Sequence, residues 1–155
     1  MLASASPIYS GSSGRGALVN ERGTADKVQT QHQLLKSQLS GALRAAEGEQ
    51  GPEATDRGER LARSLELHLR LEEEHYFPQA RAARPQLADG IDELVLEHTE
   101  LRRTLREAVD LLSRGDLTGG RAALGHYEVI FRDHEKREFD LLEDRTADGM
   151  SPESS

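Results

Sequence analysis

The chain of 155 residues contains no cysteine. Disulfide scaffolds, zinc sites with thiolate ligands, iron–sulfur clusters and cysteine nucleophiles are therefore excluded. Any metal ion that the protein binds must be held by nitrogen and oxygen atoms. The chain also lacks an apolar run near the roughly 18 residues of a membrane span, and its first residues show no charged segment followed by an apolar one. We therefore expect a soluble, cytoplasmic protein with no membrane partner.

Residues that favour β-strands are scarce. Valine occurs 5 times and isoleucine 3 times against 22 leucines, and aromatic residues make up 4% of the chain. This balance favours helices over sheets, and the length allows one compact domain. Positive charge is also in deficit, because the formal net charge is −8 and the basic residues are interleaved with acidic ones. Nucleic-acid binding usually needs a concentrated basic face, so we expect no nucleic-acid partner.

Four stretches carry apolar residues at intervals of three, four and seven, which is typical of helices with one buried face. They cover about residues 24–47, 56–77, 91–114 and 121–141. Short turns join them, so the pattern predicts an all-α fold, an antiparallel up-down four-helix bundle over residues 24–145. Serine and glycine dominate residues 1–23, where we expect a flexible N-terminal tail, and residues 146–155 form a polar C-terminal tail in this interpretation.

The second half of the chain repeats the first. A shift of 66 residues superimposes two histidines and one glutamate of each half: His32 on His98, His68 on His134 and Glu72 on Glu138. All six lie on the predicted apolar stripes, where leucine would be expected. Each half thus offers one histidine from its first helix and a His-x-x-x-Glu motif from its second. Residues at i and i+4 share a helix face, so we expect two helix-pair repeats to close around a single centre.

These six polar side chains point to a metal site. Left without partners in a bundle core, each would cost on the order of 1 to 3 kcal/mol. Imidazole suits iron, copper, nickel and zinc, whereas carboxylates favour harder ions and can bridge two metals, so the mixture fits two iron ions. Each iron would take two histidines, and both would share the two carboxylates and a bridging oxo or hydroxo group. One position on each iron then remains for dioxygen, peroxide or nitric oxide. The predicted metal ligands are His32, His68, Glu72, His98, His134 and Glu138.

The sequence resembles the hemerythrin-like HHE cation-binding domain family over about residues 24–145. The resemblance rests on the segments His68-Leu-Arg-Leu-Glu72-Glu73 followed by Phe77-Pro78, Glu97-His98, and His134-Glu-Lys-Arg-Glu138. It implies a four-helix bundle with metal ligands at the six positions named above. The chain departs from the oxygen-carrying hemerythrins at two points. Their third helix has a His-x-x-x-His motif where this chain has Arg102, and they have a more distant aspartate where this chain has Glu138.

We expect a non-haem di-iron protein that binds dioxygen or a related small ligand such as nitric oxide or peroxide. The alternative is an enzyme, either an oxidase or oxygenase that activates dioxygen or a protein that decomposes peroxide, acting on a small molecule. A carboxylate in place of imidazole stabilises the higher oxidation state of iron, which favours this alternative. Iron storage or sensing is a third hypothesis, less favoured because a sensor usually needs an output domain and 155 residues leave no room for one.

Two further residues are candidates for roles beside the metal ions. His75 follows His68 by seven residues on the same predicted stripe. It is either a partly exposed histidine without a special role or the source of a fifth nitrogen ligand or of a proton. Tyr127 lies two turns before His134, about 10 Å along the helix axis. It is either a packing residue or a redox relay. No catalytic residue outside the metal centre is predicted.

Overall fold

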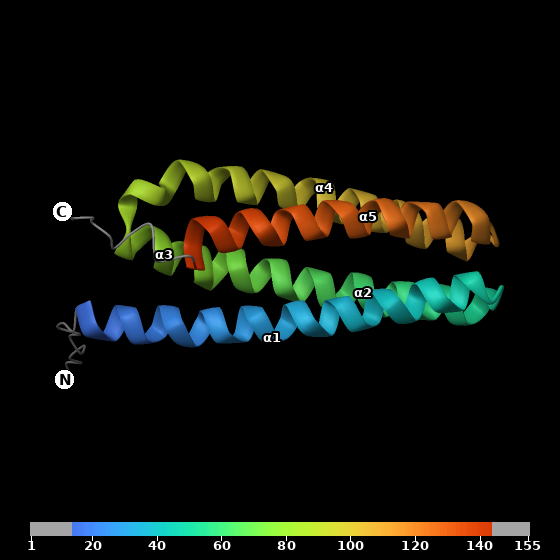
Figure 1. Cartoon of the computed structure of the whole chain (residues 1–155), viewed down its shortest axis with the longest axis horizontal. Helices are drawn as coiled ribbons and strands as arrows, with labels where there is room; N and C mark the ends of the chain where they lie inside the picture. Colours follow the sequence, from blue (N-terminus) through green and yellow to red (C-terminus); the bar gives the residue numbers. More distant parts are fainter. Residues whose placement is uncertain (1–13, 144–155) are drawn as a thin grey trace, which may run out of the picture.

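The computed structural model describes residues 14–143, which are helical almost throughout (Figure 1). Four of the helices are long: α1 (Gly14–Glu47), α2 (Gly51–Leu71), α4 (Ala88–Ser113) and α5 (Leu117–Glu138). The π-helix η1 (Glu72–Tyr76), the short helix α3 (Phe77–Ala83) and the 3₁₀-helix η2 (Pro85–Leu87) connect α2 with α4, and the π-helix η3 (Phe139–Glu143) continues α5. Residues 14–143 contain no strand, in agreement with the prediction from the leucine-rich composition.

The long helices pack side by side as a helical bundle (Figure 1). Helix α1 contacts α2 and α5, and α4 contacts α5 and α2. The turn between α4 and α5 contains Gly115 at a φ of 85°, a left-handed conformation that favours glycine. The next residue, Asp116, caps α5 by accepting a hydrogen bond of 2.8 Å from the Gly119 N–H. In the described part of the chain, no helix combines the length and the apolar character that a membrane crossing requires.

Several helix boundaries differ from the predicted ones. Helix α1 already begins at Gly14, inside the segment 1–23 for which a tail is expected, because a nucleated helix extends at little cost even through exposed residues such as Arg22. Helix α2 begins at Gly51 rather than near residue 56, with proline in its first turn, where proline is tolerated. The chain also stays helical through Pro78, which occupies the first turn of α3. Residues 1–13 and the predicted tail 146–155 lie outside the described residues.

Buried apolar residues form two clusters along the bundle. The larger, which we call the leucine cluster, is built around Leu61, Leu65, Leu101, Leu105 and Leu124. The smaller, which we call the aromatic cluster, consists of Val28, Tyr76, Phe77, Ala80, Ile91, Leu94 and Leu142. His32 on α1 and His98 on α4 lie between residues of the two clusters, and His134 on α5 lies between Phe131 of the leucine cluster and Leu142 of the aromatic cluster in η3. The two apolar clusters therefore enclose a polar cross-section of the bundle.

Candidate metal centre

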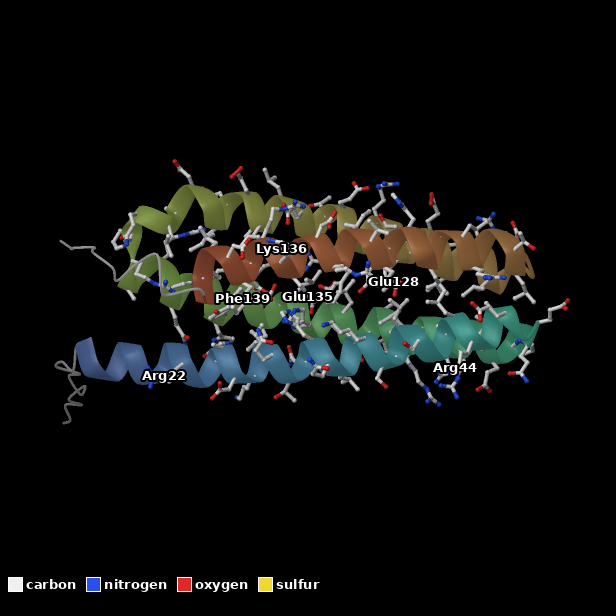
Figure 2. All side chains as sticks on the ribbon, viewed as in Figure 1. Arg22, Arg44, Glu128, Glu135, Lys136 and Phe139 are labelled. Carbon is white, nitrogen blue, oxygen red and sulfur yellow. The ribbon has the colours of Figure 1, made fainter. Side chains whose placement is uncertain are left out.

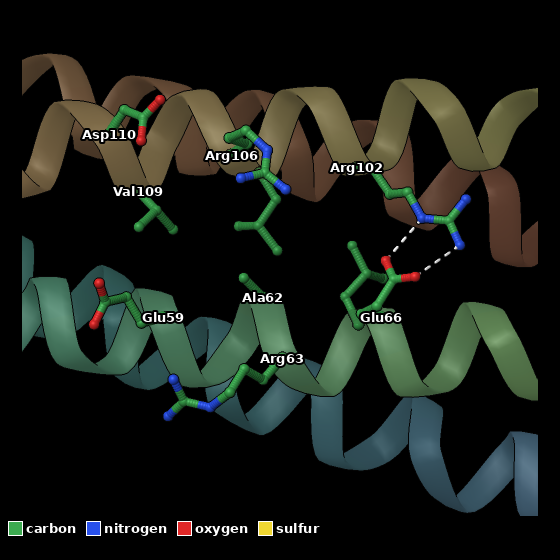
Figure 3. Close-up of a pocket in the computed structure, with 10 residues that line it drawn as sticks. Glu59, Ala62, Arg63, Glu66, Arg102, Arg106, Val109 and Asp110 are labelled. Atoms are coloured by element: carbon green, nitrogen blue, oxygen red, sulfur yellow. Dashed lines mark hydrogen bonds and ion pairs between the residues drawn. The ribbon is translucent and has the colours of Figure 1, made fainter.

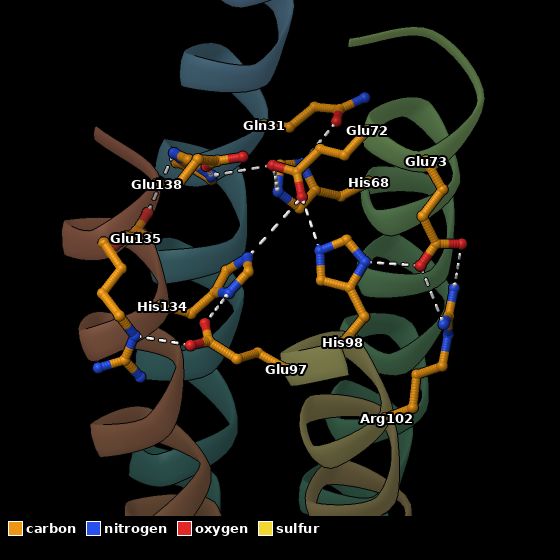
Figure 4. A network of polar contacts seen from close by, with 12 residues as sticks. Gln31, His68, Glu72, Glu73, Glu97, His98, Arg102, His134, Glu135 and Glu138 are labelled. Atoms are coloured by element: carbon orange, nitrogen blue, oxygen red, sulfur yellow. Dashed lines mark hydrogen bonds and ion pairs between the residues drawn. The ribbon is translucent and has the colours of Figure 1, made fainter. Parts of the chain in front are cut away.

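The six predicted ligands lie together in this cross-section, which we call the polar layer. Figure 4 shows His68, Glu72, His98, His134 and Glu138 in it. Helix α1 contributes His32, α2 contributes His68, and α4 contributes His98. Helix α5 contributes two residues one turn apart, and Glu72 is the first residue of η1. The exposed fraction is 3% for His32 and 0% for each of the other five side chains. The six histidines and glutamates that interrupt the apolar faces of the helices are thus brought together in one buried volume.

Glu72 lies between two pairs of histidines and presents one oxygen to each. Its Oε2 atom is 3.1 Å from the Nε2 atom of His68 and 3.8 Å from that of His32. Its Oε1 atom is 3.0 Å from the Nε2 atom of His98 and 3.9 Å from that of His134. Each pair together with Glu72 forms a group of three buried side chains whose ligand atoms lie within 4.8 Å of one another. The layer therefore contains two adjacent groups that could each hold a cation, with one carboxylate in common.

The atoms in the layer fit bound cations. Ligand atoms at about 2.1 Å from one ion lie about 3.0 to 4.2 Å apart, which matches the separations around Glu72. Several of these atoms are buried without a hydrogen-bond partner among the described residues, namely the Nε2 atoms of His32, His68 and His134, Oε2 of Glu72 and both carboxyl oxygens of Glu138. Buried polar atoms are normally paired, so a convergent set of unpaired donors to metal is the arrangement that a cation would complete.

Glu138 belongs to the layer but to neither group of three. Its Oε1 atom lies 3.4 Å from the Nε2 atom of His32. Burial and the negative charge of Glu72 raise the pKa of the Glu138 carboxyl well above its ordinary value. Without a cation, two buried carboxyl groups this close cannot both ionise readily, and Glu138 is the one that holds the proton.

His32, His134 and Glu72 are charged when no cation is bound. Burial lowers the pKa of His32, but contacts with the Glu138 and Glu72 carboxyl groups outweigh burial and raise it to about 10. Burial likewise opposes the contacts of His134 with Glu72 and Glu97, which raise its pKa to about 9. Burial also disfavours the charged form of Glu72, but polar contacts with Glu138 and the histidines hold its pKa well below the ordinary range. Protons thus supply the positive charge that the carboxylates need.

A second set of residues holds each imidazole ring by its other nitrogen. The Nδ1 atoms of His98, His134 and His68 donate hydrogen bonds to Glu73, Glu97 and Gln31 at 2.6, 2.7 and 2.8 Å. The Nδ1 atom of His32 lies 3.2 Å from Glu135. These oxygens only accept hydrogen bonds, so Nδ1 carries the proton in each ring and Nε2 can face the centre as a ligand atom.

Arginines hold two of these acceptors in place. Arg102 contacts Glu73 at 3.2 Å and also pairs with Glu66 at 2.8 Å, at the edge of a surface hollow between α2 and α4 (Figure 3). Arg137 donates to Glu97 at 2.6 Å. No such role for Arg102 follows from the sequence alone. Its role was missed because its partners lie on α2 and η1, at distances that sequence spacing within α4 does not show.

The acceptors of the histidine Nδ1 atoms were also missed as a set. One signal was present in the sequence, because Gln31 and Glu97 each directly precede the first histidine of their half and occupy the same position in the 66-residue repeat. Glu73 and Glu135 have no equivalent acidic or amide residue in the other half of the repeat. They contact histidines of other helices, and only the packing of the bundle brings them together.

The structure places His75 outside the bundle core and Tyr127 inside it. His75 is exposed, which agrees with the interpretation of an exposed histidine without a special role but not with a place on the inward stripe. The reason is η1, where the Phe77 N–H bonds to the Glu72 carbonyl five residues back. The wider turn brings Tyr76 inside instead.

Tyr127 is 1% exposed and stacks on Phe131, whose ring centroid lies 5.9 Å from that of His32. Its predicted place beside the layer therefore agrees with the structure, while its role stays a prediction.

The fold and the polar layer define a helical protein with a buried histidine and glutamate site for cations. The sequence model of the Hemerythrin HHE cation binding domain matches residues 24–144. The chain therefore belongs to the hemerythrin HHE cation-binding family, as the resemblance predicted. Comparison with curated proteins and with solved structures finds no match.

Proposed function

We propose that the polar layer holds two iron ions and that the protein binds dioxygen, or a related small ligand such as nitric oxide or peroxide, at this centre. His32 and His68 would hold one iron, and His98 and His134 the other. Glu72 would bridge them, and Glu138 would complete the set from α5. The observation that carries the proposal is the position of Glu72, whose two oxygens face the two histidine pairs at 3.0 and 3.1 Å.

The chain's own residues have three tasks in this proposal. The four histidines offer Nε2 atoms because acceptors hold the protons on Nδ1. The leucine and aromatic clusters exclude water on both sides of the layer. The two carboxylates offset the charge of the cations. When bound, the iron pair supplies the open coordination positions and the redox chemistry for a small diatomic ligand.

The proposal also treats the bundle as two equivalent helix pairs, α1 with α2 and α4 with α5, in an antiparallel up-down order. Two observations support this interpretation. The histidines and glutamates of the two pairs coincide after a shift of 66 residues. A π-helix starts at Glu72 in the first pair and directly after Glu138 in the second, so the same irregularity accompanies both carboxylates.

An oxidase or oxygenase acting on a small organic molecule is the second candidate. One feature favours it, a hollow of about 340 Å³ between α1 and α5 that is lined by His32. This volume falls within the range of about 300 to 1,000 Å³ for ligand pockets. The hollow is lined mainly by charged side chains, however, whereas pockets for organic ligands are mostly apolar. Its chemistry fits a small polar ligand better than an organic substrate.

Anaerobic loading of the purified protein with ferrous iron tests the proposal. Metal analysis should give two irons per chain, and exposure to air should produce an absorption change that reverses when oxygen is removed. Irreversible oxidation with consumption of dioxygen would favour the enzyme. Failure to retain iron, with retention of another divalent ion, would contradict the choice of metal, and failure to retain any cation would contradict the site.

A further inference from the structure

The two halves of the polar layer are not held equally firmly. The Nδ1 atoms of His98 and His134 lie 2.6 and 2.7 Å from the carboxylates of Glu73 and Glu97. The Nδ1 atom of His32 lies 3.2 Å from Glu135, the longest of the four separations. His32 is also the one member of the layer with measurable exposure, at 3%. Its ring is therefore the least constrained of the four.

The basic side chains that contact these carboxylates also differ between the two halves. Arg102 and Arg137 hold Glu73 and Glu97 through guanidinium contacts of 3.2 and 2.6 Å. The cation beside Glu135 is Lys36, at 3.5 Å. A lysine at this distance acts as a mobile point charge, whereas a guanidinium fixes a carboxylate through planar, directed donors. Glu135 is thus oriented by fewer directed contacts than Glu73 and Glu97.

The repeat is broken at the partner of the second histidine. Glu97 accepts from His134, but the residue at the equivalent position in the first half is Gln31, which accepts from His68 at 2.8 Å. A carboxylate on the Nδ1 proton makes an imidazole a stronger metal ligand than a neutral amide does. His68 is therefore a weaker donor than His134, although the two occupy equivalent places.

A path to solvent opens at the loosely held half. His32 and Glu135 line the hollow between α1 and α5, together with Lys36, Lys136 and Phe139. Figure 2 shows Glu135, Lys136 and Phe139 on this face of the molecule. Phe139 is 49% exposed and the Glu135 side chain is 13% exposed, so both residues reach solvent at this hollow.

We infer that the cation position at His32 and His68 is the exchangeable one, and that the position at His98 and His134 retains its ion. Glu135 acts as a positioning residue that holds His32 on the ion and moves aside with it, so that ions enter and leave through the hollow between α1 and α5. This inference rests on the proposed function, because it requires that both positions bind a cation.

Release of metal to a chelator tests the inference. The full chain is loaded anaerobically with two equivalents of ferrous iron and mixed with an excess of a ferrous chelator, and the chelated iron is followed by absorbance. We expect two phases of one equivalent each. Protein loaded with Zn²⁺ and depleted of one equivalent should keep metal-shifted imidazole ¹⁵N signals for His98 and His134. Release of both ions in one phase, or retention at His32 and His68, would overturn the inference.

Four variants assign the phases. Glu135→Ala should accelerate the fast phase about tenfold or more and leave the slow phase unchanged, since loss of such partners costs about 10- to 100-fold in metal affinity. Glu135→Gln keeps an acceptor and should give a smaller change. Glu97→Ala is the matched control in the other half and should accelerate only the slow phase. Gln31→Glu should slow the fast phase.

The outcomes separate this inference from the proposed function. Two ions that bind but leave together would overturn the inference and leave the di-metal site intact. A chain that retains no cation fails the proposed function itself. Circular dichroism of each metal-free variant checks that it folds. If Glu135→Ala does not fold, the response of the fast phase to Gln31→Glu and to Glu135→Gln still decides the matter, and an unchanged fast phase in both contradicts the inference.

Discussion

The leucine cluster and the polar layer are neighbouring parts of one bundle core, but their contributions to stability depend on different conditions. Each leucine of the cluster stabilises the fold by leaving water, whatever is bound elsewhere. Each group of the polar layer loses its hydration on burial, and this loss is offset only by a counter-charge. In the metal-free protein that counter-charge is protons, and the pKa values of His32 and His134 are raised accordingly to about 10 and about 9.

From this difference we expect the bundle to fold around the leucine cluster before any metal is bound, and the polar layer to link the remaining stability to cation binding. Metal should therefore act on the layer and leave the leucine cluster untouched. Substitutions in the two regions should then respond differently to metal, which makes the comparison testable.

Loss of Glu72 should have the largest effect. Glu72→Gln keeps the shape of the side chain but removes the charge and one of the two oxygens that face the histidine pairs. A ligand present at 1,000 times its dissociation constant stabilises a fold by about 4 kcal/mol, and the variant should lose most of this metal-dependent gain. Chemical denaturation with and without iron, with metal analysis, measures it. The control is Glu74→Gln, an exposed neighbour in η1 that pairs with Arg70. Unchanged iron content in Glu72→Gln would contradict the shared-carboxylate assignment.

A truncation in the leucine cluster should come next. Leu61 is 0% exposed, and Leu61→Ala should lower the free energy of unfolding by about 3 kcal/mol because it leaves a cavity. The loss should be the same in metal-free and metal-loaded protein, and iron content should not change. Paired denaturation curves check this equality. A loss that depends on metal would show that the two regions are coupled.

The stability that depends on the polar layer should change with pH, whereas the contribution of the leucine cluster should not. His32 and His134 have folded pKa values of about 10 and about 9 against an ordinary 6.5, so their protonation stabilises the metal-free fold fully below about pH 6.5. That contribution decreases as pH rises above about 6.5, at about 1.4 kcal/mol per pH unit for each proton, and is gone above the folded pKa values of about 9 and about 10. Metal-bound imidazoles carry no such proton, so the gain from metal should widen as pH rises from 7 to 9. Thermal unfolding of both forms in this range measures it, and a constant gain would contradict the protonation of the layer.

The smallest effect should come from Tyr127, which borders the two regions. Its hydroxyl is buried without a hydrogen-bond partner among the described residues, and burial raises its pKa. Tyr127→Phe should therefore increase the free energy of unfolding by up to about 1 kcal/mol and leave iron content unchanged. Oxidation of the loaded protein should proceed at the normal rate if Tyr127 only packs. A slower oxidation would favour the relay that the sequence left open.

Much of this arrangement could be predicted from the sequence because it depends on periodicity. The apolar stripes predicted the helices, and the interruptions at His32 and His98, repeated after 66 residues, predicted that the polar groups would meet. The family assignment from the His-x-x-x-Glu segments is confirmed by the match over residues 24–144. The metal ligands themselves, the iron pair and its small ligand stay predictions.

Other features could not be predicted because they depend on contacts between helices or on local departures from the α-helix. Glu135 reaches His32 from α5, and nothing in its sequence neighbourhood marks that contact. His75 was placed inside because the count of residues assumed a regular α-helix through Glu72. The π-turn adds one residue at that point, so Tyr76 takes the inward place.

The two π-turns also bear on how parts of this chain can be exchanged with other bundles. A segment that crosses Glu72 or Glu138 contains a one-residue phase change relative to an ideal helix, so a graft taken from a regular bundle would point every later side chain in the wrong direction. Crossover points for chimeras therefore belong on the leucine side of the histidines, where the helical phase is regular.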